Sequence, residues 1–207
     1  VGRAEVPRYE VTVPLKANTP EDRAAGMTEA LRAVAVKASG KREAAGNPAI
    51  SGANPGKYVQ RYSTTADQML KVGFDGSAIE QLLQQAGLPL WPAERPRVVI
   101  DAPVPDRDAV ERVAQWRGLP VEWAAGAPSP SARRAVLAGV PSGGEFAWTF
   151  THDGRTTEMR GSAEDGIHLA ADTLSARYAP ASTRSSSNLK LRVDGMDDLA
   201  DYSGLLA

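Results

Sequence analysis

The segment from Met69 to Ile100 constrains the fold more than any other part of the chain. An alternating apolar run that ends at Phe74 predicts a strand with one buried face. Asp75 or Ser77 then offers the cap of an amphipathic helix, and an apolar run at Arg97–Ile100 predicts a returning strand. The segment therefore predicts a strand-helix-strand unit of an α/β protein. It contains no nucleophile elbow, metal-ligand cluster or phosphate-binding loop.

The residues before Arg97 predict the rest of a first unit. Tyr9–Leu15 alternates between apolar and polar residues, as a half-buried strand does. Thr19 caps an amphipathic helix that Gly40 ends. Tyr58–Ser63 and Gln68–Phe74 have the pattern of a hairpin. Together with the helix and strand that follow, the predicted order is β-α-β-β-α-β, one sheet covered by two helices.

A second, smaller unit is predicted with the order α-β-β-β-β-α. Its elements are a helix capped by Asp106, strands at Val121–Trp123, Val136–Val140 and Phe146–Phe150, a hairpin turn at His152-Asp153-Gly154 before a further strand, and a helix capped by Ser162. The chain is thus predicted to be an α/β (α+β) protein with units at residues 1–104 and 105–180. Residues 181–207 are predicted to be a linker, a strand at Asn188–Val193 and a helix from Asp197, the start of a truncated third unit.

Composition excludes several classes of protein. The 207 residues carry a net charge of −1, and a dedicated nucleic-acid binder would need a basic field. Cysteine is absent, which excludes disulfides, thiolate zinc sites, iron–sulfur clusters and a cysteine nucleophile. No apolar run approaches the ~18 residues of a membrane span. The first residue is Val1 rather than Met, as it would be after removal of a signal peptide.

Several short motifs carry a resemblance to a known family. They are YEVTVPLKANTPEDRAAGMTEALRAVAVKASG from Tyr9, then YVQRY, LKVGFDGSAIEQLLQQAGLPLW and ERPRVVI. In order and spacing they resemble the proteobacterial domain-of-unknown-function 2066 family, across roughly residues 9–180. This resemblance implies an exported, periplasmic protein of the bacterial envelope. The family has no agreed activity, so it implies no catalytic residues.

The second unit carries another likeness. A strand ending in Gly139, a polar hairpin and a helix ending near Tyr178 resemble the small α/β domain of TolB amino-terminal regions and of lipoprotein activators of penicillin-binding proteins. This likeness implies a domain that binds other envelope proteins. The chain lacks the lipid-attachment cysteine of such lipoproteins, so a lipid anchor is not expected.

The candidate binding residues are Trp91, Arg95 and Arg97. In the run PLWPAERPR they could present an aromatic anchor and two cations to a partner. The alternative is that Trp91 folds back over the edge of the sheet, as large aromatic side chains usually do. The two histidines are interpreted as polar surface residues, His152 in a solvated turn and His168 on a helix. No catalytic residue, metal ligand or cofactor site is predicted.

These observations predict a non-catalytic envelope protein that binds other proteins. Two alternatives stay open. One is a hydrolase acting on an envelope polymer, with acidic residues gathered from separate elements, for which Glu111 and Glu122 are an untested pair. The other is a structural subunit of a membrane-associated complex. A concave pocket with clustered carboxylates would favour the enzyme, and a binding surface would favour the first prediction.

Overall fold

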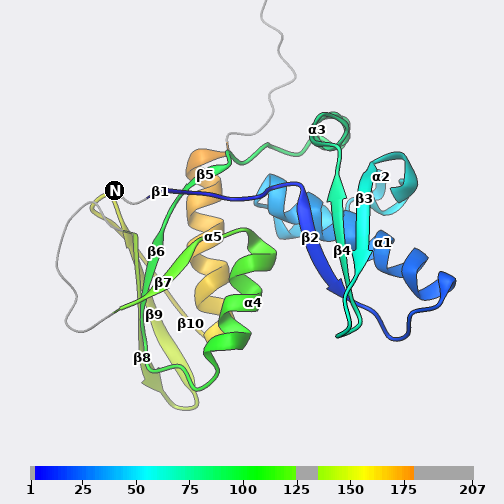
Figure 1. Cartoon of the computed structure of the whole chain (residues 1–207). Coiled ribbons are helices and arrows are strands. Elements are labelled where there is room, and N and C mark those ends of the chain that lie inside the picture. The colour runs from blue at the N-terminus through cyan, green and yellow to red at the C-terminus, as the bar shows by residue number, and fades with distance from the viewer. Residues whose placement is uncertain (1–2, 125–134, 180–207) are drawn as a thin grey trace, which may run out of the picture.

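Three sheets and five α-helices form the part of the chain that the structure, a computed structural model, describes: residues 3–124 and 135–179 (Figure 1). The first half contains β1 (Arg3–Glu5), β2 (Glu10–Pro14), α1 (Pro20–Ser39), a 3₁₀ turn (Arg42–Gly46), α2 (Pro48–Ser51), a second 3₁₀ turn (Pro55–Lys57), β3 (Val59–Thr64), β4 (Met69–Phe74) and α3 (Gly76–Gln85). The second half contains β5 (Glu94–Pro96), β6 (Val98–Asp101), α4 (Arg107–Arg117), β7 (Val121–Trp123), β8 (Ala135–Ser142), β9 (Glu145–His152), β10 (Arg155–Gly161) and α5 (Ala163–Tyr178). The mixed α/β class predicted from the sequence is confirmed.

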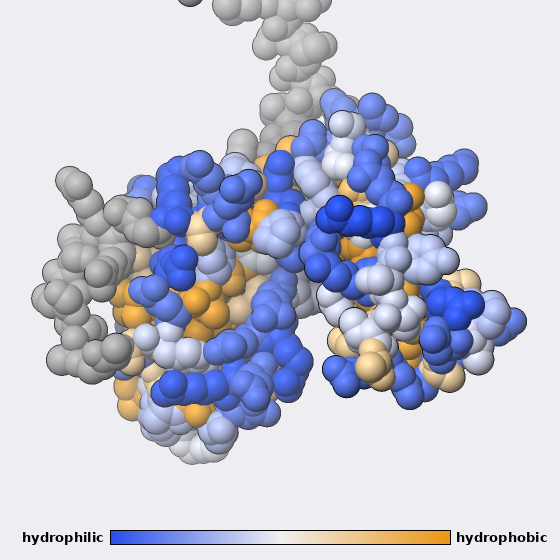
Figure 2. Space-filling model, viewed as in Figure 1, coloured by the Kyte–Doolittle hydropathy of each residue, from blue (hydrophilic) through white to orange (hydrophobic). Residues whose placement is uncertain are grey.

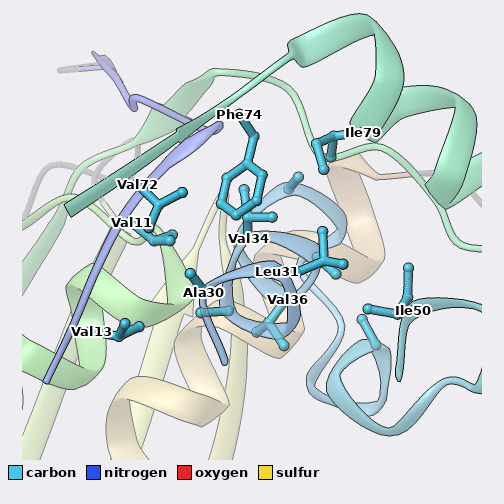
Figure 3. Packing of buried hydrophobic residues seen from close by; sticks show 14 of the residues in the cluster. Val11, Val13, Ala30, Leu31, Val34, Val36, Ile50, Val72, Phe74 and Ile79 are labelled. Atoms are coloured by element: carbon cyan, nitrogen blue, oxygen red, sulfur yellow. The ribbon is translucent and has the colours of Figure 1, made fainter. Parts of the chain in front are cut away.

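The first sheet is antiparallel, with β4 between β2 and β3. α1 passes behind the three strands in the view of Figure 1. Side chains from the strands and from α1, α2 and α3 point toward one another in a common core (Figure 3). This first core includes Val11, Val13, Leu31, Val34, Ile50, Leu70, Val72, Phe74 and Ile79. Burying one such side chain contributes about 1.5–3 kcal/mol, so the core accounts for much of the stability of this half.

The second sheet has the strand order β10-β9-β8-β6-β7. β6 runs parallel to β7 and β8, whereas β9 is antiparallel to both β8 and β10. α4 and α5 lie on the side of this sheet that faces the first half of the chain (Figure 1). The second core includes Trp91, Val98, Ile100, Leu137, Trp148, Phe150, Ile167 and Leu174. β1 and β5 pair in a separate two-stranded sheet.

The position of β6 corrects the predicted strand order. The sequence interpretation made it the last strand of β-α-β-β-α-β in the first sheet, but β6 pairs with β7 and β8 in the second sheet. A short apolar run does not specify its partner, and β6 is central in a sheet that buries it between two neighbours. The first sheet therefore has three strands. The two cores divide between Leu88 and Trp91, which is before the boundary predicted at residue 104.

The structure confirms several helix starts and one hairpin turn that were predicted from local signals in the sequence. At Thr19, Asp106 and Ser162 the side chain accepts a hydrogen bond from a backbone N–H of the first helical turn. Of the two cap candidates before α3, the Asp75 carboxylate accepts from the N–H of Ala78 at 2.8 Å. The hairpin turn between β9 and β10 is also confirmed, because its two central residues have φ of +48° and +73°.

Two further findings concern the limits of the fold. Within the described residues no helix combines the length and apolarity that crossing a membrane requires. The linker predicted at residues 181–187, the strand at Asn188–Val193 and the helix from Asp197 lie outside the described residues.

Candidate functional site

The three candidate binding residues lie in different surroundings. Trp91 and Arg95 are fully buried, each 0% exposed. Arg97 has a side chain that is 43% exposed and lies 3.7 Å from the carboxylate of Glu122. The outward arrangement expected for Trp91 and Arg95 is therefore wrong, and the burial of Trp91 agrees with the alternative interpretation of this residue. A contact between Arg97 and a partner stays a prediction.

Arg95 is buried because backbone carbonyl groups surround its guanidinium. Nε donates to the carbonyl of Pro92 at 2.9 Å, and the two terminal nitrogens donate to the carbonyls of Lys37 at 2.8 Å and Gly118 at 2.6 Å. The last two carbonyls lie at the carboxyl ends of α1 and α4, where the helix dipole favours a cation. The guanidinium also lies 3.8 Å from the centre of the Trp91 ring. These contacts compensate for a burial that lowers the pKa of Arg95.

Arg117 is a second buried cation and joins α4 to α1 and α5. Its NH2 group donates to the carbonyl of Gly40 at 3.0 Å and to the carboxylate of Asp172 at 2.6 Å. Its NH1 group lies 3.0 Å from Nδ1 of His168. Burial and the charge of Arg117 lower the pKa of His168, so the neutral imidazole accepts this bond. We refer to Arg95, Arg117 and the groups they contact as the arginine junction; it connects the two cores.

Both histidines differ from their predicted surroundings. His168 is half-buried at the arginine junction, so it is not a free surface residue. His152 is only 5% exposed, because Tyr178 at the end of α5 covers it: the Tyr178 hydroxyl lies 2.9 Å from Nε2. Asp153 lies 3.5 Å from the same nitrogen, and Nδ1 is buried without a partner among the described residues. Burial lowers the pKa of His152, which favours the neutral ring.

Two adjoining hollows open on the first sheet, with volumes of about 330 Å³ and 250 Å³. Glu10, Arg61 and Gly73 line both of them. Hydrophilic residues cover much of this face in the view of Figure 2. We call the lining the Glu10 surface; it consists of Arg8, Tyr9, Glu10, Gln60, Arg61, Ser63, Lys71 and Gly73, with adjacent backbone.

Strand register explains how the centre of the Glu10 surface forms. Glu10, Gly73 and Arg61 lie opposite one another on β2, β4 and β3. Because the middle residue is glycine, the Arg61 side chain crosses β4 and donates to the Glu10 carboxylate at 3.0 Å. A Cβ at Gly73 would come within 2.9 Å of Arg61 Cγ. Lys71, on the same face of β4, lies 2.8 Å from the other carboxylate oxygen of Glu10.

The charges of this centre remain open to a partner. The Arg61 side chain is 77% exposed and that of Lys71 is 50% exposed, while that of Glu10 is 27% exposed. Hydrogen bonds from Lys71 and Arg61 lower the pKa of Glu10, so its carboxylate is charged at neutral pH. Such a carboxylate is a poor general acid, because that role requires a proton at the working pH. The arrangement therefore does not suit a general acid.

One rim of the Glu10 surface is fixed by Arg8 and Tyr9. Arg8 donates to the carbonyl of Trp91 at 3.2 Å, and its guanidinium lies 4.9 Å from the centre of the Tyr9 ring. The Tyr9 hydroxyl donates to Glu80 on α3. Burial and this bond raise the pKa of Tyr9 to about 12, so the phenol stays protonated. The rim therefore joins the surface to α3 and to the backbone beside the arginine junction.

The two acidic residues considered for a hydrolase, Glu111 and Glu122, each contact another side chain. Glu111 accepts from the indole N–H of Trp123 at 2.6 Å, and Glu122 lies beside Arg97. Across residues 3–124 and 135–179, no group of three or more His, Asp or Glu side chains is placed to hold a metal ion. Sequence reasoning missed Glu10, Arg61 and Lys71 as a group. Alternation placed Glu10 on the polar face of its strand, but no local signal gave its neighbours on β3 and β4.

Comparisons with known proteins place part of the chain beside a family of unknown function. Residues 6–92 match the model of a domain of unknown function, DUF8605. The matched segment contains the whole of the first sheet, α1 to α3 and the Glu10 surface, and it ends just after Trp91. No curated protein and no solved structure matches the chain.

This match corrects the resemblance inferred from the motifs. DUF8605 is a different domain of unknown function from the 2066 family, so the motifs that begin at Tyr9 do not identify the latter. Short runs such as a capped helix followed by a strand recur in many α/β proteins, which is why their order misled. The matched residues end before the second half, and no curated protein or solved structure supports the likeness inferred there. The exported location stays a prediction.

Proposed function

We propose that the protein is a non-catalytic binding protein that contacts another protein through the Glu10 surface. The observation that carries this proposal is the pair of adjoining hollows that share Glu10, Arg61 and Gly73. Arg61 and Lys71 each keep half or more of their side chain exposed at this place while sharing one carboxylate. Partly exposed charges around a concave surface typically provide specificity and orient a partner.

Three properties of the surface support protein binding over small-molecule chemistry. The hollows are partly open to solvent and include the charged side chains of Glu10 and Arg61, whereas ligand pockets are usually enclosed and mostly apolar. Their centre lies across three strands, so sheet register fixes the backbone positions of these residues. The adjoining strand β3 is an edge strand, which extends the surface beyond the hollows.

The test is affinity capture from extracts of the cells that make this protein, with three forms of the chain. They are the unchanged protein, a double variant Arg61→Glu/Lys71→Glu, and a control variant Arg112→Glu on an exposed residue of α4. The double variant reverses both charges of the Glu10 surface, and the control reverses one charge in the other half. Circular dichroism of all three forms checks that they fold alike.

We expect one or more proteins to be recovered with the unchanged protein and the Arg112→Glu control and to be lost with the double variant. Recovery of the same proteins with the double variant would overturn the proposal, as would the absence of any specific protein in all three captures. Repeating the capture at higher salt should weaken recovery, because exposed charges beyond a Debye length are screened.

A further inference from the structure

We infer that the partner segment recognised by the Glu10 surface is an extended strand with acidic residues at alternate positions, which pairs with the free edge of β3. This inference rests on the protein-binding function proposed above and names the chemistry of the partner. It has three parts: an available strand edge, two cations on the outer face of β3 and β4, and an aromatic side chain on the opposite face.

The strand edge is available because β3 ends its sheet. In the described part of the chain β3 pairs with β4 alone, on one side. The residues from Gln60 to Ser63 are all exposed, as expected of a strand edge that no other described element covers. An open edge of this kind pairs readily with an extended segment through main-chain hydrogen bonds. A bulge between Val59 and Arg61 leaves Arg61–Thr64 as the regular stretch, so the added strand is short.

Cations next to the edge select acidic side chains. Arg61 and Ser63 point to the outer face, where Gly73 and Lys71 lie opposite them on β4. A strand added beside β3 lies about 4.8 Å away, and its directly opposed Cβ atoms come within about 5.5 Å. In the structure the guanidinium of Arg61 crosses β4 to Glu10, so a glutamate at that position binds it after the Arg61 side chain, which is 77% exposed, turns toward the free edge. The next outward position lies beside Ser63, at the hollow that Lys71 also lines.

Glu10 shows what the two cations bind when no partner is present. Its carboxylate is held by Arg61 at 3.0 Å and Lys71 at 2.8 Å, although it comes from the far strand of the sheet. A carboxylate from an added strand competes for the same two cations from the other side. Glu10 therefore acts as an internal competitor, and removing its charge should strengthen binding of an acidic strand.

The opposite face of β3 explains why acidic residues should occupy only alternate positions of the partner segment. Tyr62 is 55% exposed and lies opposite Val72, so it is on the other face of the strand from Arg61. Aromatic side chains pair favourably with β-branched neighbours across two strands. The inferred segment therefore alternates acidic residues, which face Arg61, with apolar residues, which face Tyr62.

The probe is a short, end-blocked peptide of alternating glutamate and valine, labelled for fluorescence anisotropy with the full chain. The matched control peptide replaces each glutamate by lysine. We expect the acidic peptide to bind at least about tenfold more tightly, and to weaken at high salt. The Glu10→Gln variant should bind the acidic peptide roughly three- to tenfold more tightly, the range expected from releasing two exposed ion pairs.

Two further peptides test strand pairing itself. One carries N-methyl groups at the odd backbone positions and the other at the even positions; in an added strand one of these two sets donates hydrogen bonds to β3. We expect one of the two peptides to lose binding and the other to retain it. Equal binding by both, equal affinity for the acidic and basic peptides, or an unchanged affinity of Glu10→Gln would each overturn the inference.

These results are separable from those for the proposed function. If the peptides fail while Arg61→Glu/Lys71→Glu still abolishes capture, the protein binds a partner of other chemistry at this surface, and only the inference is lost. If capture is unaffected as well, both are lost. Sedimentation of the protein alone checks a second copy as the occupant of β3: a dimer that the acidic peptide does not dissociate would overturn the inference.

Discussion

Replacing Arg95 by alanine tests whether the arginine junction stabilises the packing of the two halves. The change removes a guanidinium that donates to carbonyls of Pro92, Lys37 and Gly118. A buried carbonyl left without a donor costs about 1–3 kcal/mol. The lost contact with the ring of Trp91, 3.8 Å away, contributes about 2 kcal/mol more for a desolvated pair.

One contribution to the free energy of unfolding acts in the opposite direction. Within the described residues Arg95 forms no ion pair with a carboxylate, so its removal also relieves the cost of burying a charge. We therefore expect the free energy of unfolding to fall by about 3–5 kcal/mol, the range typical of disrupting a buried, hydrogen-bonded charge. For a chain of 207 residues this corresponds to a decrease in Tm of roughly 6–20 °C.

Urea denaturation followed by tryptophan fluorescence measures this effect, because the indole of Trp91 becomes exposed on unfolding. The matched control is Arg97→Ala, two residues away, whose side chain is 43% exposed and 3.7 Å from Glu122. An exposed pair of this kind contributes less than about 1 kcal/mol. A loss below about 1 kcal/mol for Arg95→Ala, or an equal loss for both variants, would refute the argument that carbonyls and the Trp91 ring stabilise the buried cation.

Three other predictions follow from the same structure. Burial lowers the pKa of His152 below its unfolded value of about 6.5. Its contribution to stability is therefore present above pH 6.5 and is lost as the pH falls through the folded pKa. The His152→Gln variant should flatten this part of a curve of unfolding free energy against pH. Ser162→Ala removes the cap of α5 and should cost about 1 kcal/mol, measured by urea denaturation. Lys71→Ala should raise the pKa of Glu10 more than Arg61→Ala does, because the bond from Lys71 lowers that pKa more than the bond from Arg61. NMR titration of the Glu10 carboxyl group measures both changes, and the reverse order would contradict the prediction.

Features that depend on neighbouring residues in the chain could be predicted from the sequence. The cap at Thr19 and the hairpin at Asp153-Gly154 each follow from a side chain or a backbone preference within three residues. The mixed α/β class follows from the same local periods. The pairing of β6 could not be predicted from such local patterns, because a run of three apolar residues fits either sheet. Packing with β7 and β8 decides which sheet it joins.

The binding residues were harder to predict for a related reason. Arginine is rarely buried, and nothing near Arg95 in the sequence shows that the carboxyl ends of α1 and α4 converge on it. The grouping of Glu10 with Arg61 depends on the register of three strands, including the bulge before Arg61. Alternation gives the face of a strand on which a residue lies, but it does not give the residue's neighbour across the sheet.

The family match ends at residue 92, immediately after an indole that contacts the end of α1 at Gly40 and also belongs to the second core. A polypeptide cut at that point would keep the first core but would leave the face of Trp91 that packs on Arg95 and the second core open to solvent. An exposed aromatic of this size favours self-association. Proteins that join this segment to a different C-terminal half would need other residues to enclose the Trp91 ring, or a smaller residue at that position.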